Sequence, residues 1–186
     1  GVSGHAQSAY VWEPGGAQYE FAVSQTNAAI EAALLVRPGS QVVAIMDIQG
    51  ESDTGETEAA YIASKEATIA GLRADITGAS NVPYVIGSMV PEAIAADAGL
   101  APIDNAHSML ALTGTNVRFV RGPSGRTADD LHYNVAGIRE FGPDMAEAIP
   151  SSSDVTPAVF TLTDVTAATA NTSYESNAIT VSGLGP

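Results

Sequence analysis

Apolar residues follow two alternating patterns along the first 149 residues of the chain. Four segments carry them at the spacing of an amphipathic helix: 19–36, 57–77, 102–113 and 134–149. Three shorter segments are almost continuously apolar, as parallel strands covered on both faces are: 41–48, 83–89 and 116–121. Helices that alternate with strands imply right-handed crossovers. The pattern therefore predicts an α/β fold in which helices cover a parallel sheet in three layers.

Pro143 interrupts the last helical segment, 134–149. Proline has no backbone N–H to donate, and its ring crowds the preceding turn. We therefore expect this helix to kink or to split near Gly142.

The pattern changes after residue 150. The last residues contain no Lys or Arg and many Thr, Ser and Val, and the runs 160–163 and 178–182 alternate as strands do. Two or three strands cannot form a stable sandwich alone. We expect a first domain at 1–149, a linker at 150–157, and the start of a second, β-rich domain at 158–186. This last segment resembles the opening of Ig-like repeats in bacterial surface and phage tail proteins.

Charge and composition exclude several kinds of partner. Seven Lys and Arg residues against 21 Asp and Glu residues give a net charge of −14, which would repel nucleic acid. No apolar stretch reaches the roughly 20 residues that span a bilayer. There is no cysteine, and the three histidines, at positions 5, 107 and 132, are far apart in the sequence. We therefore expect no transition metal and no cofactor, and interpret His5 and His107 as surface or packing residues.

An acidic stretch, DIQGESDTGETE, begins at the end of the first predicted strand. Ligands of open parallel sheets bind at the carboxyl ends of the strands, so this position indicates a site. Five residues match ligand positions of a calcium-binding EF-hand loop: Asp47, Gln49, Glu51, Asp53 and Glu58. However, Ser52 stands where that loop requires glycine, which argues against an EF-hand and leaves an irregular cation site open.

A second candidate site lies before the last predicted helix, at residues 127–134. Asp129 and His132 are three residues apart, so one turn can bring the carboxylate against the imidazole. Such a pair orients a histidine that acts as general base for a serine hydroxyl. The alternative is that Asp129 or Asp130 caps the helix and His132 only packs.

Several blocks together resemble a known enzyme family. They are QGESD at 49–53, GLR at 71–73, VPYVIG at 82–87 and DDLHYNVAGIREFG at 129–142. Their order and spacing resemble the sialate O-acetylesterase-like carbohydrate esterases of the SGNH hydrolase superfamily, over about residues 1–149. The resemblance implies an SGNH or flavodoxin-like three-layer fold.

The resemblance also implies roles for individual residues. Asp129 and His132 would be the acid and base of a catalytic triad, and the Gln49 side chain would donate to the oxyanion hole. Gly50 would permit a close approach of the backbone to the substrate. A loop glycine, Gly1 or Gly4, would add a backbone N–H group. Three further roles are expected: Glu51 and Asp53 would hold the loop, Glu56 and Glu58 would begin the next helix, and Tyr61 and Trp12 would line the cleft, although a core position is equally open for Tyr61.

The chain departs from the family pattern in two ways. Asp47 and Ile48 replace an aromatic pair such as Trp-His before QGE. In addition, the family's nucleophile lies on a first strand well before QGE, whereas here only one predicted helix precedes Gln49. Nothing places Ser3 or Ser8 within reach of the base. We therefore expect a fold that is incomplete at its N-terminus, with the nucleophilic serine upstream of this chain.

Two functions are consistent with these features. The first is a serine-type O-acetylesterase that acts on an O-acetylated cell-surface polysaccharide, as part of a larger extracellular or phage tail protein. The alternative is a non-catalytic glycan-binding or structural module of a tail fibre or surface protein. In both cases the expected partner is a glycan, and a homo-oligomer or larger assembly is possible.

Overall fold

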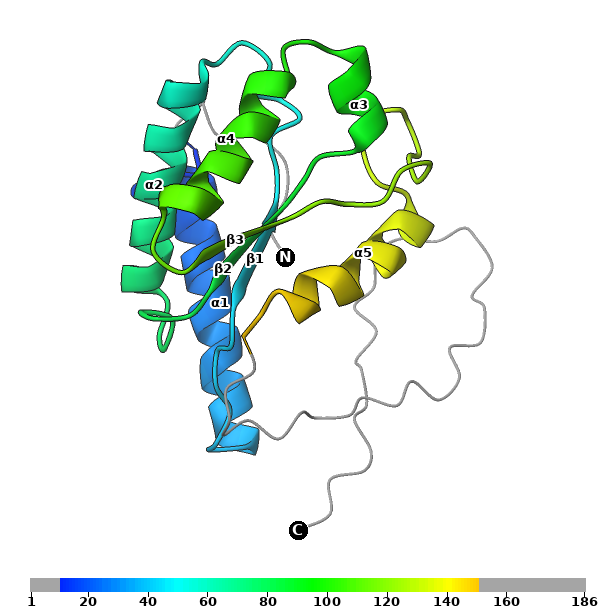
Figure 1. The fold of residues 1–186 in the computed structure, drawn as a ribbon. Helices are drawn as coiled ribbons and strands as arrows, with labels where there is room; N and C mark the ends of the chain where they lie inside the picture. Colours follow the sequence, from blue (N-terminus) through cyan, green and yellow to red (C-terminus); the bar gives the residue numbers. More distant parts are fainter. Residues whose placement is uncertain (1–10, 151–186) are drawn as a thin grey trace. The chain divides into compact units, whose positions relative to one another are not determined.

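The computed structural model describes residues 11–150. Within them, helices and strands alternate along the chain (Figure 1). In order they are α1 (Ala17–Val36), β1 (Ile45–Ile48), α2 (Glu58–Asp75), β2 (Tyr84–Gly87), α3 (Pro91–Ala96), α4 (Ala101–Thr113), β3 (Val117–Val120) and α5 (Val135–Glu147). The chain divides into two units, Gly1–Ser151 and Ser152–Pro186. The predicted β-rich segment, 158–186, lies outside the described residues.

The strands form a parallel sheet in the order β1-β2-β3. In register, Ile45 of β1 pairs with Tyr84 of β2, and Tyr84 pairs with Val117 of β3. This confirms the predicted parallel pairing. Each strand is shorter than its apolar run, because the run continues beyond the paired residues into buried loops, as at Ser88 and Met89.

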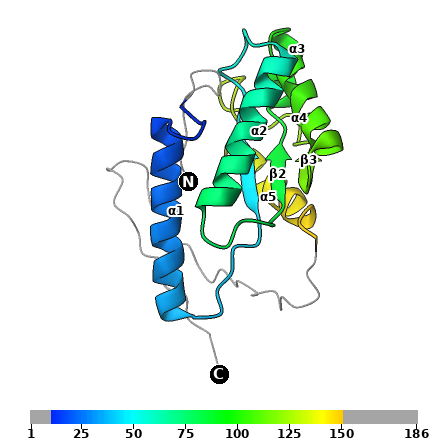
Figure 2. The same ribbon diagram turned by 90° about the vertical axis from the view of Figure 1, so that its left-hand side faces the viewer.

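Helices cover both faces of the sheet, as expected of a three-layer α/β fold. Tyr84 and Ile86 of β2 point into a core with α2 and α4, whereas Val85 between them packs against Phe141 and Met145 of α5. This alternation follows from the two-residue period of a strand. α1 lies outermost, beside α2 (Figure 2).

β1 differs from the expectation for segment 41–48. That segment was predicted to be covered on both faces, but Met46 and Val43 are each 49% exposed. The reason is that β1 is an edge strand in the described residues. Phe141 and Met145 of α5 pack with Ile48 but do not cover Met46. β2, the central strand, is buried throughout.

α5 is one continuous helix from Val135 to Glu147 with Pro143 inside it, so of the two expected outcomes, a kink or a split near Gly142, the split does not occur. Pro143 and Arg139 are both exposed. Water can therefore satisfy the Arg139 carbonyl that the proline cannot bond. α3, with six residues, was not predicted, because it is too short for a helical period to show.

None of the helices in residues 11–150 has the length and apolar character needed to cross a membrane.

Candidate active site

The loop between β3 and α5 folds back on itself and presents His132 at its tip. Thr127 and Tyr133 form an antiparallel bridge. The His132 carbonyl accepts from Ala128 N (3.1 Å), and Asn134 N donates to the Arg126 carbonyl (2.7 Å). The Asn134 side chain then caps α5 by accepting from Gly137 N (2.9 Å). The cap is thus Asn134, and the alternative in which Asp129 or Asp130 caps the helix is wrong.

Asp129 binds His132 through both carboxylate oxygens. Oδ1 accepts from the backbone N–H groups of His132 (2.7 Å) and Leu131 (3.1 Å). Oδ2 lies 2.7 Å from Nδ1 of the His132 ring. The bonds to the His132 side chain, to its backbone and to the Leu131 N–H lower the pKa of Asp129 to about 2. The contact predicted between the two side chains is confirmed.

This geometry fixes the tautomer of the neutral imidazole. An ionised carboxylate can only accept, so Nδ1 carries a proton and donates it to Asp129. Nε2 of the neutral ring is then an acceptor, and it has no hydrogen-bond partner among residues 11–150. The His132 side chain is 60% exposed. A half-open histidine with one nitrogen held by a carboxylate and the other unoccupied is the arrangement of a general base.

Tyr133, which the sequence did not single out, anchors the loop next to His132. Its hydroxyl donates to the Met89 carbonyl (3.1 Å) beyond the end of β2 and lies 3.4 Å from Ser88 Oγ. Gly122 and Gly137 leave room for this ring, since a Cβ at either position would crowd it. The anchor ties the His132 loop to the central strand of the sheet.

The loop after β1 is held by the Gln49 side chain. Gln49 Nε2 donates to Asp53 Oδ2 (2.6 Å), and the turn closes where Asp53 N donates to the Gly50 carbonyl (3.0 Å). Asp53 is 1% exposed. The prediction that Asp53 accepts a local hydrogen bond is confirmed. Glu58 begins α2 as expected, with Thr57 as the cap.

Gly50 is required for a different reason from the one predicted. Its φ of +140° is a conformation that residues with a Cβ rarely adopt. A Cβ here would lie 2.9 Å from Ile103 Cγ2 and 3.0 Å from Met89 Sδ, in the interior. The position therefore needs glycine for packing and for backbone conformation, and the side on which a Cβ would project is not a substrate surface.

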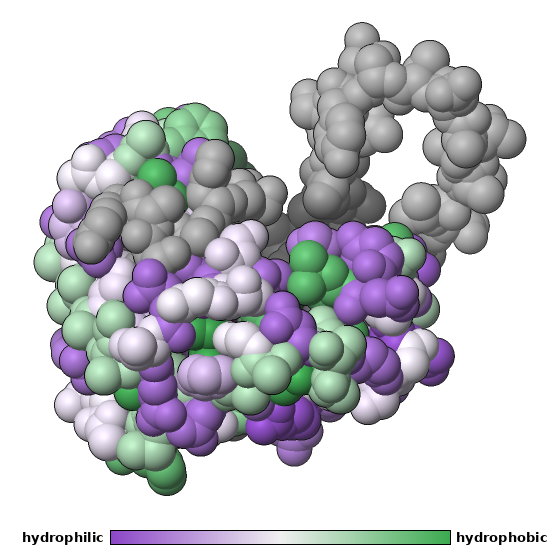
Figure 3. Space-filling view, turned by 90° about the horizontal axis from the view of Figure 1, so that it is seen from above, coloured by the Kyte–Doolittle hydropathy of each residue, from purple (hydrophilic) through white to green (hydrophobic). Residues whose placement is uncertain are grey.

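Glu51, on the loop after β1, is a carboxyl group with a raised pKa. Burial raises the pKa of this half-buried carboxyl, while neighbouring backbone N–H groups and the charge of His132 act in the opposite direction. His132 is therefore close enough to influence Glu51. Because β1 and β3 belong to one parallel sheet, the loops that follow them both lie at its carboxyl edge. Seen from above (Figure 3), hydrophilic and hydrophobic areas are intermixed over the surface of the described residues.

Tyr61 and His107 lie behind Gln49 in the interior. Tyr61 is 1% exposed, so of the two positions left open for it the structure selects the core. Its hydroxyl lies 3.0 Å from Gln49 Oε1 and 2.8 Å from His107 Nε2. His107 is fully buried, and burial lowers its pKa to about 3. The interpretation of His107 as a packing residue was therefore incomplete, because it also bonds Tyr61.

Lys65 completes this buried cluster, and sequence reasoning missed it. It is the only lysine of the chain and is 2% exposed. Its Nζ donates to Asp47 Oδ2 (2.6 Å) and to Gln49 Oε1 (2.8 Å). Burial alone would raise the pKa of Asp47, but the ion pair with Lys65 lowers it. A signal was present: Lys65 lies four residues from Tyr61 and four from Ile69, on the buried stripe of α2.

These contacts also bear on the cation site that the acidic stretch suggested. Asp47 and Gln49 bind the Lys65 ammonium, and Glu58 accepts from Asn105 Nδ2 (2.6 Å). Of the five side chains that the EF-hand count aligned, Asp47, Gln49 and Glu58 are thus bonded to other protein side chains. Within residues 11–150, no group of three or more His, Asp or Glu residues is arranged to hold a metal.

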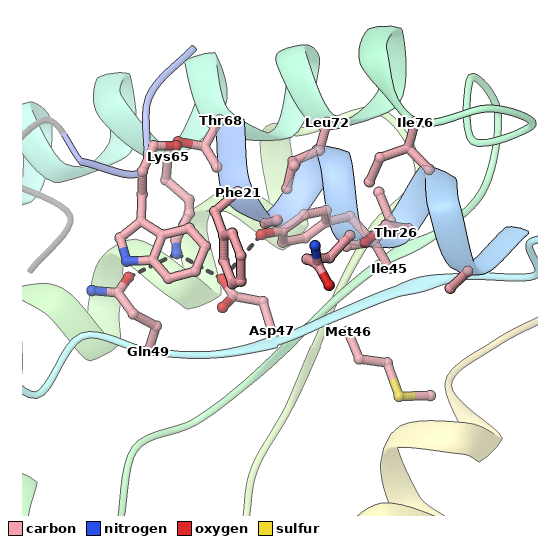
Figure 4. A pocket seen from close by; sticks show the side chains of 15 residues that line it. Phe21, Thr26, Ile45, Met46, Asp47, Gln49, Lys65, Thr68, Leu72 and Ile76 are labelled. Atoms are coloured by element: carbon pink, nitrogen blue, oxygen red, sulfur yellow. Dashed lines mark hydrogen bonds and ion pairs between the residues drawn. The ribbon is translucent and has the colours of Figure 1, made fainter. Parts of the chain in front are cut away.

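A cavity of about 450 Å³ lies between α1, β1 and α2 (Figure 4). Its walls are largely apolar, with Phe21, Ile45 and Leu72 among them, and Asp47, Gln49 and Lys65 line it as well. Trp12 also lines it, and His132 does not. The cleft expected to be shared by Gln49 and His132 is therefore not this cavity.

The proteins that this chain resembles agree with its fold. The sequence model of the family described as "Carbohydrate esterase, sialic acid-specific acetylesterase" matches residues 1–151. A crystal structure of a protein from Arabidopsis thaliana is similar, with 25% sequence identity and a TM-score of 0.59 over 79% of this chain. The match covers 57% of the Arabidopsis chain. Comparison with curated proteins found no match. The family match ends before the predicted β-rich segment.

Proposed function

Because this chain belongs to the carbohydrate esterase family of sialic acid-specific acetylesterases, we propose that it carries the base and part of the oxyanion hole of a serine-type O-acetylesterase. The observation that carries this proposal is the Asp129–His132 pair, with Oδ2 2.7 Å from Nδ1 and with Nε2 unoccupied within residues 11–150. Its position at the carboxyl edge of a parallel sheet is where such folds bind their ligands.

In the proposed mechanism, a serine hydroxyl attacks the carbonyl carbon of an acetyl ester while His132 Nε2 takes its proton. Asp129 holds the ring in the tautomer that this step needs and stabilises the imidazolium. The negative charge that develops on the carbonyl oxygen accepts a hydrogen bond from the Gln49 amide. The tetrahedral intermediate collapses and the ester bond to the sugar breaks. His132 returns the proton to the sugar oxygen, and the deacetylated sugar leaves. Water, activated by His132, then hydrolyses the acetyl-serine and releases acetate.

The nucleophile is proposed to come from a segment upstream of Gly1. No serine hydroxyl within residues 11–150 makes a hydrogen bond to the His132 ring. Ser3 and Ser8 lie outside the described residues, as do Gly1 and Gly4, which we propose as backbone donors to the oxyanion. The Arabidopsis structure, of which this chain covers 57%, contains segments with no counterpart here. This difference in length supports a contribution from outside the chain.

We propose an O-acetylated polysaccharide as the substrate, which is consistent with the carbohydrate esterase family. An extracellular or virion setting, such as a phage tail, is part of the same proposal. It rests on the composition of residues 151–186, which lie outside the described residues.

The test uses the full-length polypeptide with a chromogenic acetate ester and with an O-acetylated polysaccharide. His132→Ala should abolish acetate release from both. Asp130→Asn is a suitable control: Asp130 is exposed, adjacent to the catalytic pair, and has a φ of 62° that asparagine tolerates. It should retain full activity. If His132→Ala hydrolyses both substrates as fast as the wild type, the esterase proposal is wrong. Polysaccharide binding without hydrolysis by the wild type would favour the glycan-binding module.

A further inference from the structure

The single lysine of this chain lies in the interior, against the amide that the proposed mechanism aims at the oxyanion. We propose that Lys65 is a positioning residue, which holds the Gln49 side chain with its N–H₂ end available to the reacting carbonyl. This inference rests on the oxyanion role proposed for Gln49. It adds a residue that does not touch the substrate and that acts through the amide (Figure 4).

The orientation of the Gln49 amide is determined by three partners. Oε1 accepts from Lys65 Nζ (2.8 Å) and from the Tyr61 hydroxyl (3.0 Å), while Nε2 donates to Asp53 Oδ2 (2.6 Å). A flipped amide would turn two N–H donors toward an ammonium group and place its oxygen against a carboxylate. The contacts with Lys65 and Asp53 would both become repulsive, so these two charged groups select one orientation of the amide.

The same contacts leave one donor unused. An amide nitrogen has two hydrogens, and Asp53 takes one of them. The second has no acceptor among residues 11–150. It is the group that can donate to an oxyanion. Because the acceptor oxygen of the amide is bonded to a charged donor, the amide is polarised and its remaining N–H becomes a stronger donor.

Lys65 is itself tethered to the strand that ends at Gln49. Its Nζ lies 2.6 Å from Asp47 Oδ2, and Asp47 also accepts from the Tyr84 hydroxyl (3.0 Å) of β2. Asp47 precedes Gln49 by two residues, so both side chains leave the chain on the same face. The ammonium group is thereby held between two fixed points of one backbone segment.

Tyr61 has its own support from α4. If its hydroxyl donates to Gln49 Oε1, it must accept from His107, whose Nε2 lies 2.8 Å away and therefore carries the proton. His107 Nδ1 is then a bare acceptor, consistent with its having no partner within residues 11–150. With a pKa lowered to about 3 by burial, His107 stays neutral at working pH and this support does not change.

A buried ion pair is not needed to hold two elements together, since well-packed apolar residues often do this equally well. This makes a functional test possible. In the full-length protein, Asp47→Asn combined with Lys65→Met removes the ammonium without leaving an unpaired carboxylate. On a chromogenic acetate ester, we expect kcat to fall about 10–100-fold, a part of the 10²–10³ effect of losing one oxyanion donor, with KM changed less than about twofold.

Arg73→Met is the matched control on the same helix. Arg73 is also cationic and partly buried, but it donates to the carbonyls of Val82, Thr115 and Asn116 at the opposite, amino edge of the sheet. The control should lower the melting temperature and leave kcat of the folded protein unchanged. An equal loss of kcat in this control would mean that general destabilisation accounts for the effect, and would overturn the proposal.

Coupling to Gln49 gives the decisive readout. In a Gln49→Ala background, the Asp47→Asn/Lys65→Met change should cause no further loss of kcat, because no amide remains to be positioned. Additive losses would overturn the positioning role while leaving the esterase proposal intact. If Gln49→Ala alone leaves kcat unchanged, the oxyanion role of Gln49 is wrong and the positioning role falls with it.

If circular dichroism shows that the Asp47→Asn/Lys65→Met variant is unfolded, Tyr61→Phe replaces it in the comparison between the wild-type and Gln49→Ala backgrounds. It removes the 3.0 Å donor to Oε1 and keeps the buried ring. We expect kcat to fall about 3–10-fold in the wild type and to stay constant in the Gln49→Ala background, as for the loss of one of two orienting hydrogen bonds. An unchanged kcat in the wild-type background would overturn the proposal.

Discussion

Replacing Gly50 by alanine tests the local structure that places Gln49. The backbone at Gly50 has a φ of +140°, and a Cβ would lie 2.9 Å from Ile103 Cγ2 and 3.0 Å from Met89 Sδ. Both neighbours are fully buried, so they cannot move aside freely. Backbone strain at such a φ costs about 1–3 kcal/mol and overpacking about the same, so Gly50→Ala should lower the free energy of unfolding by about 2–6 kcal/mol.

Gly55→Ala in the same loop is the matched control. No atom outside its chain neighbours lies within 4 Å of a Cβ at this position, and its φ is not in the left-handed region. We expect its unfolding free energy to stay within about 0.5 kcal/mol of the wild type. Guanidinium unfolding can be followed through Trp12, the only tryptophan of the chain. If Gly50→Ala costs less than about 1 kcal/mol, the reasoning about this turn is wrong.

Three further predictions concern the His132 loop. Asp129→Asn should reduce kcat about 10²–10⁴-fold, because the asparagine cannot hold the catalytic tautomer or stabilise an imidazolium, and steady-state kinetics would measure this. The pKa of Asp129 is lowered from 3.8 to about 2. Its support of the His132 ring is therefore complete above about pH 4 and is lost as the pH falls through about 2. The Asp129 carboxylate should therefore stay ionised throughout pH 5 to 8, and a limb of the wild-type rate profile in that range that disappears in Asp129→Asn would contradict this. Tyr133→Phe removes the hydroxyl bond to the Met89 carbonyl and should lower kcat about 3–10-fold with little change in melting temperature, whereas an unchanged kcat would show that the anchor does not position His132.

Local contacts were the part of the site that could be predicted from the sequence. Asp129 and His132 are three residues apart, so backbone geometry alone limits how far their side chains can separate. The same holds for Gln49 and Asp53, which the turn at Gly50 brings together. For these pairs, spacing and residue type are sufficient evidence for a contact.

The support behind Gln49 could not be derived in this way. It joins Lys65 of α2 and, through Tyr61, His107 of α4, and their meeting depends on how two helices pack on one face of the sheet. The wrong reason given for Gly50 has the same origin, because Ile103 and Met89 crowd it from distant segments. A lysine on the buried stripe of a helix was nevertheless visible in the sequence, and it indicated an internal partner.

The fold followed the same division. Long periodic segments, such as the one that became α2, were predicted within a few residues. α3 was not predicted, because six residues are too few to show the apolar period of a helix. The coverage of β1 was predicted wrongly, because an apolar run does not reveal whether a strand lies at the centre of a sheet or at its edge, as the exposure of Met46 shows.

The central claim is that His132 activates a serine for ester hydrolysis. The most direct measurement is active-site labelling of the full-length protein with a fluorophosphonate, followed by peptide mass spectrometry of the wild type and of His132→Ala. We predict that one serine, upstream of Gly1, is modified in the wild type and that this modification is lost in His132→Ala, because the hydroxyl then has no base. No modified serine in the wild type, or equal modification in both proteins, would contradict the account.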